Sequence, residues 1–190
     1  MSGLALTFDD GPDPEWTPRL LDLLDHVGAK ATFFPIASRA AAQPALIARV
    51  REAGHAIGLH CHEHVRHSTR DRAWLESDTR EALRLLAQVD VRPSLWRTPW
   101  GDTAGFSAEV AAEHHLGIVS WTLDTHDWRG DSAEMMLADT QAGIVEDAIV
   151  LAHDGIGPGA KRDGMSQTVR YVERAASLAR RRGLRLEALR

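Results

Sequence analysis

The sequence predicts an α/β domain in which parallel strands alternate with helices. Short apolar runs recur between longer segments whose apolar residues are three and four positions apart, and several of the short runs are apolar throughout. Strands that are buried on both faces and separated by helices are typical of a parallel sheet covered by helices. No repeat or low-complexity stretch divides the chain. We therefore expect one barrel-like or doubly wound domain over residues 1–190.

Seven short apolar runs are the candidate strands. In chain order they cover residues 4–8, 31–34, 56–59, 95–97, 118–121, 149–151 and 184–186. The first run ends at Asp9 and Asp10, so two adjacent carboxylates follow a buried strand. Because parallel α/β sheets collect their chemistry at the carboxyl ends of the strands, the residues that follow each run are the functional candidates.

Helices are expected between these strands. Two clear apolar stripes comprise Leu20, Leu23, Leu24 and Val27 in one segment, and Leu75, Ala82, Leu86 and Val89 in another. Thr17 before Pro18 predicts the N-cap of the first helix, and Asp131 with Glu134 three residues later predicts a capping box. A basic cluster at 180–182 closes a last apolar stripe and is expected to be its solvated end.

The composition argues against several classes of protein. A formal charge of −5 at pH 7 gives no electrostatic reason to expect nucleic acid as a partner. Cys61 is the only cysteine, so no intramolecular disulfide can form. No apolar stretch approaches the roughly 20 residues of a membrane span, and the first strand leaves no room for a signal peptide. The chain as written is therefore expected to be cytoplasmic. A secreted or cell-wall location follows instead if Met1, Ser2 and Gly3 remain from a longer natural N-terminus.

A candidate metal site follows the first and third runs. His60 and His64 are four residues apart, a spacing that can aim two imidazoles at one ion. Ten histidines in this chain give roughly 0.5 such pairs by chance, so the pair alone is weak evidence. Asp9 and Asp10 strengthen it, since adjacent carboxylates repel unless a cation or proton neutralises one. With Asp10, His60 and His64 as ligands, one position stays open for water, and Asp9 is free to act as a base. A plain Asp-Gly-Pro turn without metal is the alternative.

A candidate acid follows the sixth run. His153 stands at the end of that strand, where an imidazole can donate a proton near neutral pH. Asp127 could hold the ring and raise its basicity, as orienting carboxylates do in other acid–base pairs. The alternative is that His153 merely ends a strand while Asp127 caps a turn. Tryptophans on the same rim, Trp100 and Trp128 among them, suit stacking on a sugar ring or closing a small acyl pocket. Core packing is the other interpretation of these rings.

Five motifs in order resemble those of a known family. They are TFDD at 7–10, GHAIGLHCHEH at 54–64, RTPWG at 97–101, DTHDW at 124–128 and IVLAHD at 149–154. The chain resembles the catalytic domain of the polysaccharide deacetylases, metal-dependent esterases that include chitin, peptidoglycan N-acetylglucosamine and acetylxylan deacetylases. Five ordered matches exceed the false-positive rate of single short motifs.

The resemblance implies a fold and a set of catalytic roles. The fold is a distorted (β/α) barrel with fewer than eight strands, which agrees with about seven parallel strands counted from the sequence. Asp9 is the implied general base, and Arg97 pairs with it. His153 is the implied general acid, oriented by Asp127.

The resemblance also implies a metal ion and a pocket for the acetyl group. The implied ligands of one divalent ion are Asp10, His60 and His64. Zinc is the expected ion, with cobalt, manganese or nickel as alternatives because ligand identity alone does not select among them. The Trp100 backbone N–H is implied as an oxyanion donor, and Trp128 and Leu151 as the lining of the pocket for the acetyl methyl.

The sequence thus predicts a hydrolase that removes acetyl groups from an N- or O-acetylated carbohydrate. Leu59 and Cys61 stand beside His60 where many family members have Asn and Ser or Thr, and Trp100 replaces a usual Phe or Tyr. These differences leave the sugar open. A deformylase or small-amide hydrolase of the same mechanism is one alternative, and a non-catalytic carbohydrate-binding domain is another. The presence of both a candidate base and a candidate acid argues against the binding domain.

Overall fold

The computed structural model describes residues 3–190, so Met1 and Ser2, which entered the expectation about the N-terminus, lie outside the described residues. Its strands are β1 (Gly3–Asp9), β2 (Ala31–Phe34), β3 (Ala56–Ile57), β4 (Leu95–Trp96), β5 (Gly117–Ile118), β6 (Leu123–Asp124), β7 (Ile149–His153) and β8 (Arg185–Leu186). Every pairing between these strands is parallel. The predicted α/β class with parallel strands is confirmed.

β1 is the centre of the larger sheet. The strand order is β3-β2-β1-β7-β6, and β8 pairs with the start of β1. β4 and β5 form a separate pair, which one bridge between Leu59 and Trp96 connects to the segment after β3. Within residues 3–190, β5 and β6 do not pair. The strands therefore form a distorted barrel that is open on one side.

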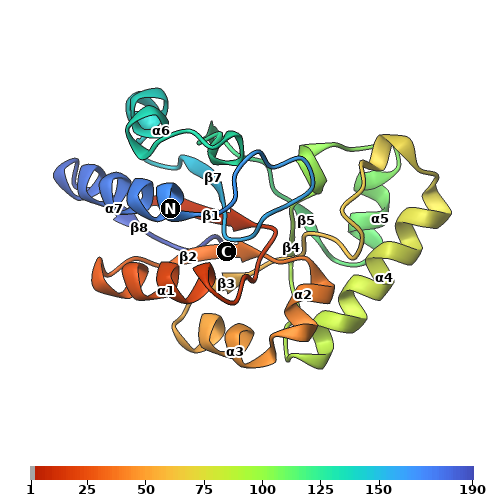
Figure 1. Cartoon of the computed structure of the whole chain (residues 1–190). Helices are drawn as coiled ribbons and strands as arrows, with labels where there is room; N and C mark the ends of the chain where they lie inside the picture. Colours follow the sequence, from red (N-terminus) through yellow and green to blue (C-terminus); the bar gives the residue numbers. More distant parts are fainter. Residues whose placement is uncertain (1–2) are drawn as a thin grey trace.

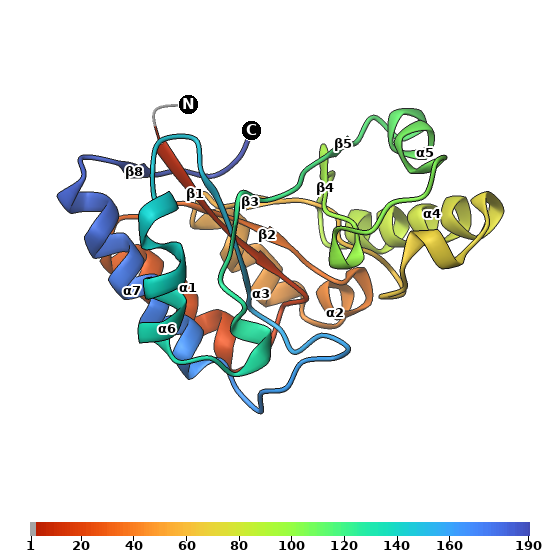
Figure 2. The same cartoon turned by 90° about the horizontal axis from the view of Figure 1, so that it is seen from above.

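The helices form an arc around these strands, as Figures 1 and 2 show. They are α1 (Trp16–His26), α2 (Ala37–Ala42), α3 (Pro44–Glu52), α4 (Arg72–Gln88), α5 (Ser107–Glu113), α6 (Ala133–Thr140) and α7 (Ser166–Arg181). Neighbouring helices pack in the order α6, α7, α1, α3, α2, α4 and α5. In the described part of the chain, no helix combines the length and apolar character needed to cross a bilayer.

Two apolar cores hold the arc to the strands. The larger one packs β1, β2 and β7 against α1, α6 and α7, with Leu6, Phe8 and Tyr171 fully buried. The second joins α2, α4 and α5 around Trp96 and Leu86. Burying each large apolar side chain is worth about 1.5–3 kcal/mol. Every residue of β1 is buried, so its polar end is fixed in place by the core on which the strand rests.

The structure corrects the fifth predicted strand. The run at 118–121 does not continue as one strand, because β5 ends at Ile118 and the unpredicted β6 begins at Leu123. The carbonyl groups of Val119 and Ser120 accept hydrogen bonds from the Arg97 guanidinium at 3.4 and 3.2 Å. This side chain takes the place that a neighbouring strand would have, and the chain leaves the sheet there.

Both predicted N-caps are also wrong. Helix α1 begins at Trp16, so Thr17 lies inside the helix, and the Asp13 carboxylate accepts from the backbone N–H of Trp16 at 2.9 Å. In α6 the cap is Ser132 rather than Asp131, and its hydroxyl accepts from a backbone N–H of the first turn. Asp and Ser are both strong N-caps, so residue type alone does not distinguish Asp131 from Ser132.

Candidate active site

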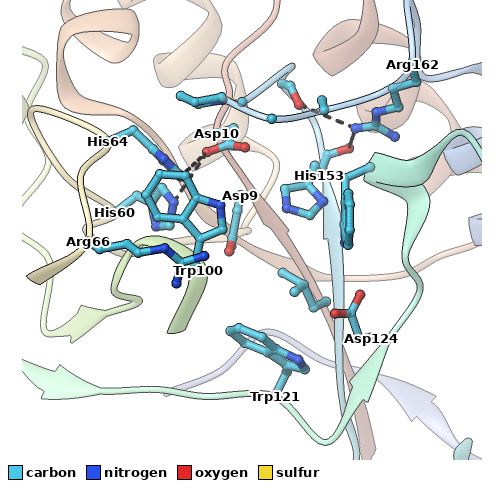
Figure 3. A pocket seen from close by; sticks show the side chains of 17 residues that line it. Asp9, Asp10, His60, His64, Arg66, Trp100, Trp121, Asp124, His153 and Arg162 are labelled. Atoms are coloured by element: carbon cyan, nitrogen blue, oxygen red, sulfur yellow. Dashed lines mark hydrogen bonds and ion pairs between the residues drawn. The ribbon is translucent and has the colours of Figure 1, made fainter. Parts of the chain in front are cut away.

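The carboxyl ends of the strands surround a cavity of about 420 Å³, shown in Figure 3. Eight of the ten predicted site residues line it: Asp9, Asp10, His60, His64, Trp100, Trp128, Leu151 and His153. The other two, Arg97 and Asp127, lie behind the cavity and are almost fully buried. All ten are therefore gathered at one end of the barrel, although their motifs are spread over most of the chain.

Asp10 is held in an unusual backbone conformation next to the end of β1. Its φ of 72° lies in the left-handed region, which is uncommon for residues other than glycine. The Asp10 carbonyl accepts from Arg39 Nη1 at 2.9 Å, and the N–H of Gly11 donates to Asp154 Oδ1 at 3.2 Å. These contacts direct the Asp10 carboxylate toward the two histidines, where Oδ1 lies 3.3 Å from Nε2 of each.

Asp10, His60 and His64 form a group whose ligand atoms all lie within 4.8 Å of one another. His60 Nδ1 lies 2.6 Å from the Arg97 carbonyl oxygen, which can only accept, so Nδ1 carries a proton and Nε2, which faces Asp10, is the nitrogen that could bind a cation. Asp10 Oδ1 is buried and has no hydrogen-bond partner among residues 3–190. Lone pairs that converge on one point fit a cation, and two imidazoles with one carboxylate are a donor set suited to zinc and its neighbours.

The charges in this group favour an ionised carboxylate. Burial alone would raise the pKa of Asp10, but the close contacts with His60 and His64, together with the positive charge of His153, outweigh it and hold that pKa below its usual range. The carboxylate that a metal ion requires is therefore already stabilised by the groups around it.

The loop that carries both histidines is fixed by a residue from α4. Asp78 is buried, and its two carboxylate oxygens accept from the backbone N–H groups of His62 and Glu63 at 3.1 and 2.7 Å. The Trp96 indole N–H donates to the His60 carbonyl at 2.9 Å. These bonds set the curvature of the segment between His60 and His64, so that both rings point at Asp10.

Asp9 lies next to this group but has a different partner. Its carboxylate is buried and accepts from Arg97 Nη1 at 3.1 Å. The same nitrogen donates to Thr7 Oγ1 at 2.5 Å, and the guanidinium also stacks over Phe34 with 4.4 Å to the ring centroid. Arg97 is fully buried. The ion pair therefore holds Asp9 in one orientation at the cavity wall.

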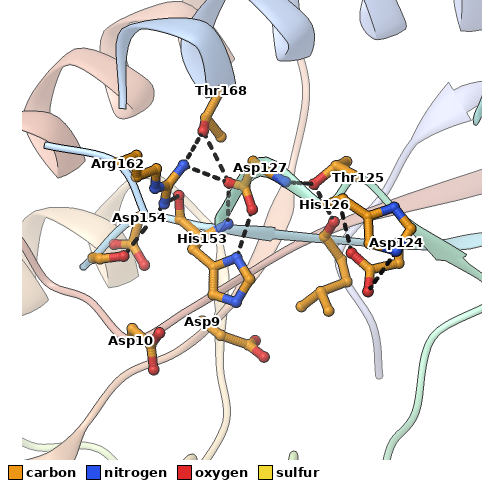
Figure 4. Close-up of polar contacts among 12 residues, drawn as sticks. Asp9, Asp10, Asp124, Thr125, His126, Asp127, His153, Asp154, Arg162 and Thr168 are labelled. Carbon is orange, nitrogen blue, oxygen red and sulfur yellow. Dashed lines mark hydrogen bonds and ion pairs between the residues drawn. The ribbon is translucent and has the colours of Figure 1, made fainter. Parts of the chain in front are cut away.

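His153 faces Asp9 and Asp10 across the cavity (Figure 4). Its Nδ1 lies 2.7 Å from Asp127 Oδ1, and its backbone N–H donates to Asp127 Oδ2 at 3.0 Å. Burial would lower the pKa of His153, but the charge and hydrogen bond of Asp127, with smaller contributions from Asp10 and Asp9, raise it to about 9. The same pairing overcomes burial at Asp127 and holds its pKa well below the usual range. His153 is thus a protonated imidazole at neutral pH, with Nε2 directed into the cavity.

Apolar and aromatic side chains complete the walls. The Trp100 ring makes an edge contact with His64 at 4.2 Å between centroids, and Trp100 itself has a left-handed φ of 56°. Trp128 and Leu151 lie beside His153 in the cavity lining, and Trp121 joins them there rather than in the core. The result is a polar centre enclosed by flat apolar surfaces, which is usual for sites that bind small organic groups.

Comparison with known proteins identifies the family. A sequence model described as polysaccharide deacetylase matches residues 2–119, more than half of the chain. The chain belongs to the polysaccharide deacetylase family. Over 184 residues it is 34% identical to a peptidoglycan-N-acetylglucosamine deacetylase of Bacillus cereus, which covers 96% of this chain and 84% of the relative. A chitooligosaccharide deacetylase of Bradyrhizobium sp. is 33% identical over 191 residues, 97% of this chain and 87% of the relative.

Solved structures give the same family fold. A peptidoglycan N-acetylglucosamine deacetylase in complex with 4-naphthalen-1-yl-N-oxidanyl-benzamide superposes with a TM-score of 0.88 at 28% identity, covering 97% of this chain and 84% of the other. A family 4 carbohydrate esterase from Streptomyces lividans in complex with acetate gives 0.87 at 26% identity, covering 97% and 91%. The predicted distorted barrel is therefore the fold that these polysaccharide deacetylases share.

In this polysaccharide deacetylase, several residues around the site were not found from sequence. Arg162 and Thr168 contact Asp127, Asp78 holds the histidine loop, and Arg39 binds the Asp10 carbonyl. The only signal in the sequence was indirect: a buried carboxylate such as Asp127 needs a second cationic or hydrogen-bonding partner, but nothing in its neighbourhood says which one.

Proposed function

We propose that this chain is a metal-dependent hydrolase that removes an acetyl group from an N- or O-acetylated carbohydrate. The observation that carries the proposal is the opposition of two groups across one cavity. On one side the buried Asp9 carboxylate lies beside the Asp10, His60 and His64 cluster, and on the other His153 is held protonated by Asp127. Relatives that cover almost the whole chain are named as deacetylases of peptidoglycan N-acetylglucosamine and of chitooligosaccharides, which supports this assignment.

Asp10, His60 and His64 would hold one divalent ion, and zinc is the ion we propose. When bound there, such an ion polarises a carbonyl and lowers the pKa of water. Three protein ligands leave room for water or substrate, as in catalytic rather than structural zinc sites. The buried Asp10 oxygen without a hydrogen-bond donor supports this use of the cluster.

Asp9 is proposed as the general base. Its carboxylate is fixed by Arg97 and lies at the cavity wall next to the cluster, where it can accept the proton of the attacking water. The ion pair with Arg97 holds the Asp9 carboxylate in the orientation that this role requires. The backbone N–H of Trp100 is proposed to donate to the oxyanion of the tetrahedral intermediate.

His153 is proposed as the general acid. It begins protonated, and its Nε2 gives a proton to the departing amine or hydroxyl of the sugar, so that acetate and the free sugar are released. Asp127 holds Nδ1 and thereby fixes the ring orientation. Trp128 and Leu151 line the cavity next to His153, and we assign the acetyl methyl group to the surface that they form.

The proposal is tested by acetate release from chitooligosaccharides, acetylxylan, peptidoglycan fragments and small N-acetyl sugars. The protein is stripped of metal and assayed with and without added zinc, beside Asp9→Asn and, as a control, Asp22→Asn at an exposed surface position. We expect zinc-dependent release that Asp9→Asn loses and Asp22→Asn keeps. Formate release, or no hydrolysis with retained sugar binding, would replace the proposal with the deformylase or the carbohydrate-binding alternative.

A further inference from the structure

A buried arginine outside every sequence motif contacts the proposed acid pair. Arg162 lies in the loop between β7 and α7, and its side chain is only 6% exposed. Its Nη1 donates to Asp127 Oδ2 at 2.8 Å and to Thr168 Oγ1 at 2.5 Å. Its Nη2 lies 3.4 Å from the carbonyl oxygens of His153 and Gly155. Figure 4 shows the guanidinium at the Asp127 oxygen that the imidazole does not contact.

Asp127 is therefore one anion between two cationic groups. Oδ1 meets the His153 ring, while Oδ2 accepts from Arg162, from the Thr168 hydroxyl at 2.8 Å and from the His153 backbone N–H. These four bonds fix the plane of the carboxylate and with it the plane of the ring. Arg162 carries a fixed positive charge. It therefore partly neutralises Asp127 and reduces the stabilisation that Asp127 gives to the His153 imidazolium.

The other charges around His153 are mostly negative. Asp9 and Asp10 face it from the end of β1, and Asp124 lines the same cavity from the end of β6. The guanidinium groups in that lining belong to Arg66 and Arg162, and of these two Arg162 contacts Asp127. An acid surrounded by carboxylates holds its proton too firmly to donate it well, because proton transfer is most efficient when the pKa of the acid is near the working pH.

We propose that Arg162 is a positioning residue of the acid pair, which fixes the Asp127 carboxylate and weakens its hold on the His153 proton. This inference rests on the proposed function in so far as His153 is the acid. Thr168 is buried near the start of α7. Its hydroxyl donates to the same carboxylate and accepts from Arg162 Nη1, which holds the guanidinium in place. The loop after β7 thus carries a residue that acts on the acid through Asp127.

The test compares Arg162→Gln with Arg162→Lys, using Arg174→Gln as a control that removes the same charge from the exposed surface of α7. With zinc and the best substrate, we expect Arg162→Gln to shift the basic limb of the kcat–pH profile to higher pH by roughly one unit. It should also lower kcat at pH 7 by about 10-fold, with KM changed little. Arg162→Lys keeps the charge but not the planar fork, so its basic limb should stay in place while kcat falls. Arg174→Gln should match the wild type.

The same shift is measured without catalysis by imidazole ¹H–¹⁵N spectra of His153 across pH, with and without zinc. Arg162→Gln is expected to raise the midpoint of this titration, and Arg162→Lys is expected to leave it in place. An unchanged midpoint and limb in Arg162→Gln, with kcat lower at every pH, would overturn the proposal and leave Arg162 a structural residue. If Arg162→Gln does not fold, a raised midpoint in Arg162→Lys would overturn it equally. Absence of acetate release from all variants would count against the proposed function, while the spectra still decide this inference.

Discussion

Two halves of one cavity differ in how their charges are satisfied. In the half formed by β1 and the loop after β3, Asp10 Oδ1 is buried and lies 3.3 Å from two imidazole nitrogens. In the half formed by η3 (Asp127–Arg129), β7 and α7, both oxygens of Asp127 accept hydrogen bonds from protein groups. We propose that a cation completes the first half, whereas the second half is complete within the chain.

The difference indicates what each half does. A site that accepts a metal ion must keep lone pairs free of protein donors, and the cost of burying them is offset only when the ion binds. A proton donor must instead keep its geometry and charge whether or not metal is present, and a closed hydrogen-bond network provides this. We expect variants in the two halves to affect different measurable quantities, and the predictions below separate them.

The largest effect is expected from loss of the acid. His153→Gln removes the proton donor but no ligand of the metal cluster, so kcat should fall by about 10²–10⁴-fold, the usual contribution of a positioned acid. Zinc stoichiometry, measured on the purified protein after dialysis, should remain that of the wild type. Loss of zinc in this variant would show that the halves are not independent.

The acid half should also make stability depend on pH in metal-free protein. The folded-state pKa of His153 is raised to about 9, above its value in an unfolded chain, so the stabilisation is complete below about pH 6 and disappears as pH rises through 9. It amounts to roughly 3 kcal/mol of unfolding free energy. Urea unfolding between pH 6 and 10 should show a decline for wild type that His153→Gln lacks. If the unfolding free energy falls with pH to the same extent in wild type and His153→Gln, this account of the His153–Asp127 pair is contradicted.

The metal half is expected to respond in zinc affinity. His64→Ala removes one of the three proposed ligands. Because loss of groups that only orient the ligands weakens zinc binding by about 10–100-fold, we expect zinc affinity to fall by at least 100-fold here. Competition with a coloured chelator measures this directly. His26→Ala, at the exposed end of α1, is the matched control and should bind zinc as the wild type does.

The smallest effect is expected from the support of the histidine loop. Asp78→Asn keeps the size of the side chain but has only one carbonyl-type acceptor for the two N–H groups of His62 and Glu63. Zinc affinity should fall by about 10-fold, at the low end for groups that orient ligands. Asp71→Asn, which keeps an efficient N-cap on the same helix, should leave zinc affinity unchanged. Equal affinities for the two variants would mean that the loop keeps its shape without Asp78.

The site could be predicted from the sequence partly because the fold is parallel and partly because the motifs resemble those of a known family, which supplied the predictions for Trp128 and Leu151. Asp9, His60, Arg97 and His153 each follow a short apolar run, and parallel strands bring such positions to one edge whatever their separation along the chain. Their placement around one cavity agrees with the sequence analysis, whereas their catalytic roles stay predictions.

The residues that support the site, Asp78 and Arg162 among them, could not be predicted from the sequence for a physical reason. Asp78 lies 15 residues from Glu63 and Arg162 lies 35 from Asp127, on a helix and a loop whose local patterns resemble solvated segments. Their burial depends on how α4 and the β7–α7 loop pack, which periodicity does not encode. Strand β6 was not predicted for a similar reason. The break before it lies where the buried Arg97 side chain binds the carbonyl groups of Val119 and Ser120, a long-range contact that the local pattern does not show.

The most direct test of the account is a zinc titration of metal-free protein followed through imidazole ¹H–¹⁵N spectra. We predict that one zinc per chain changes the Nε2 signals of His60 and His64, while the proton between His153 Nδ1 and Asp127 is present before and after zinc is added. Zinc that leaves the His60 and His64 signals unchanged, or a His153–Asp127 proton that forms only with zinc, would contradict the division of the cavity into a half completed by metal and a half complete without it.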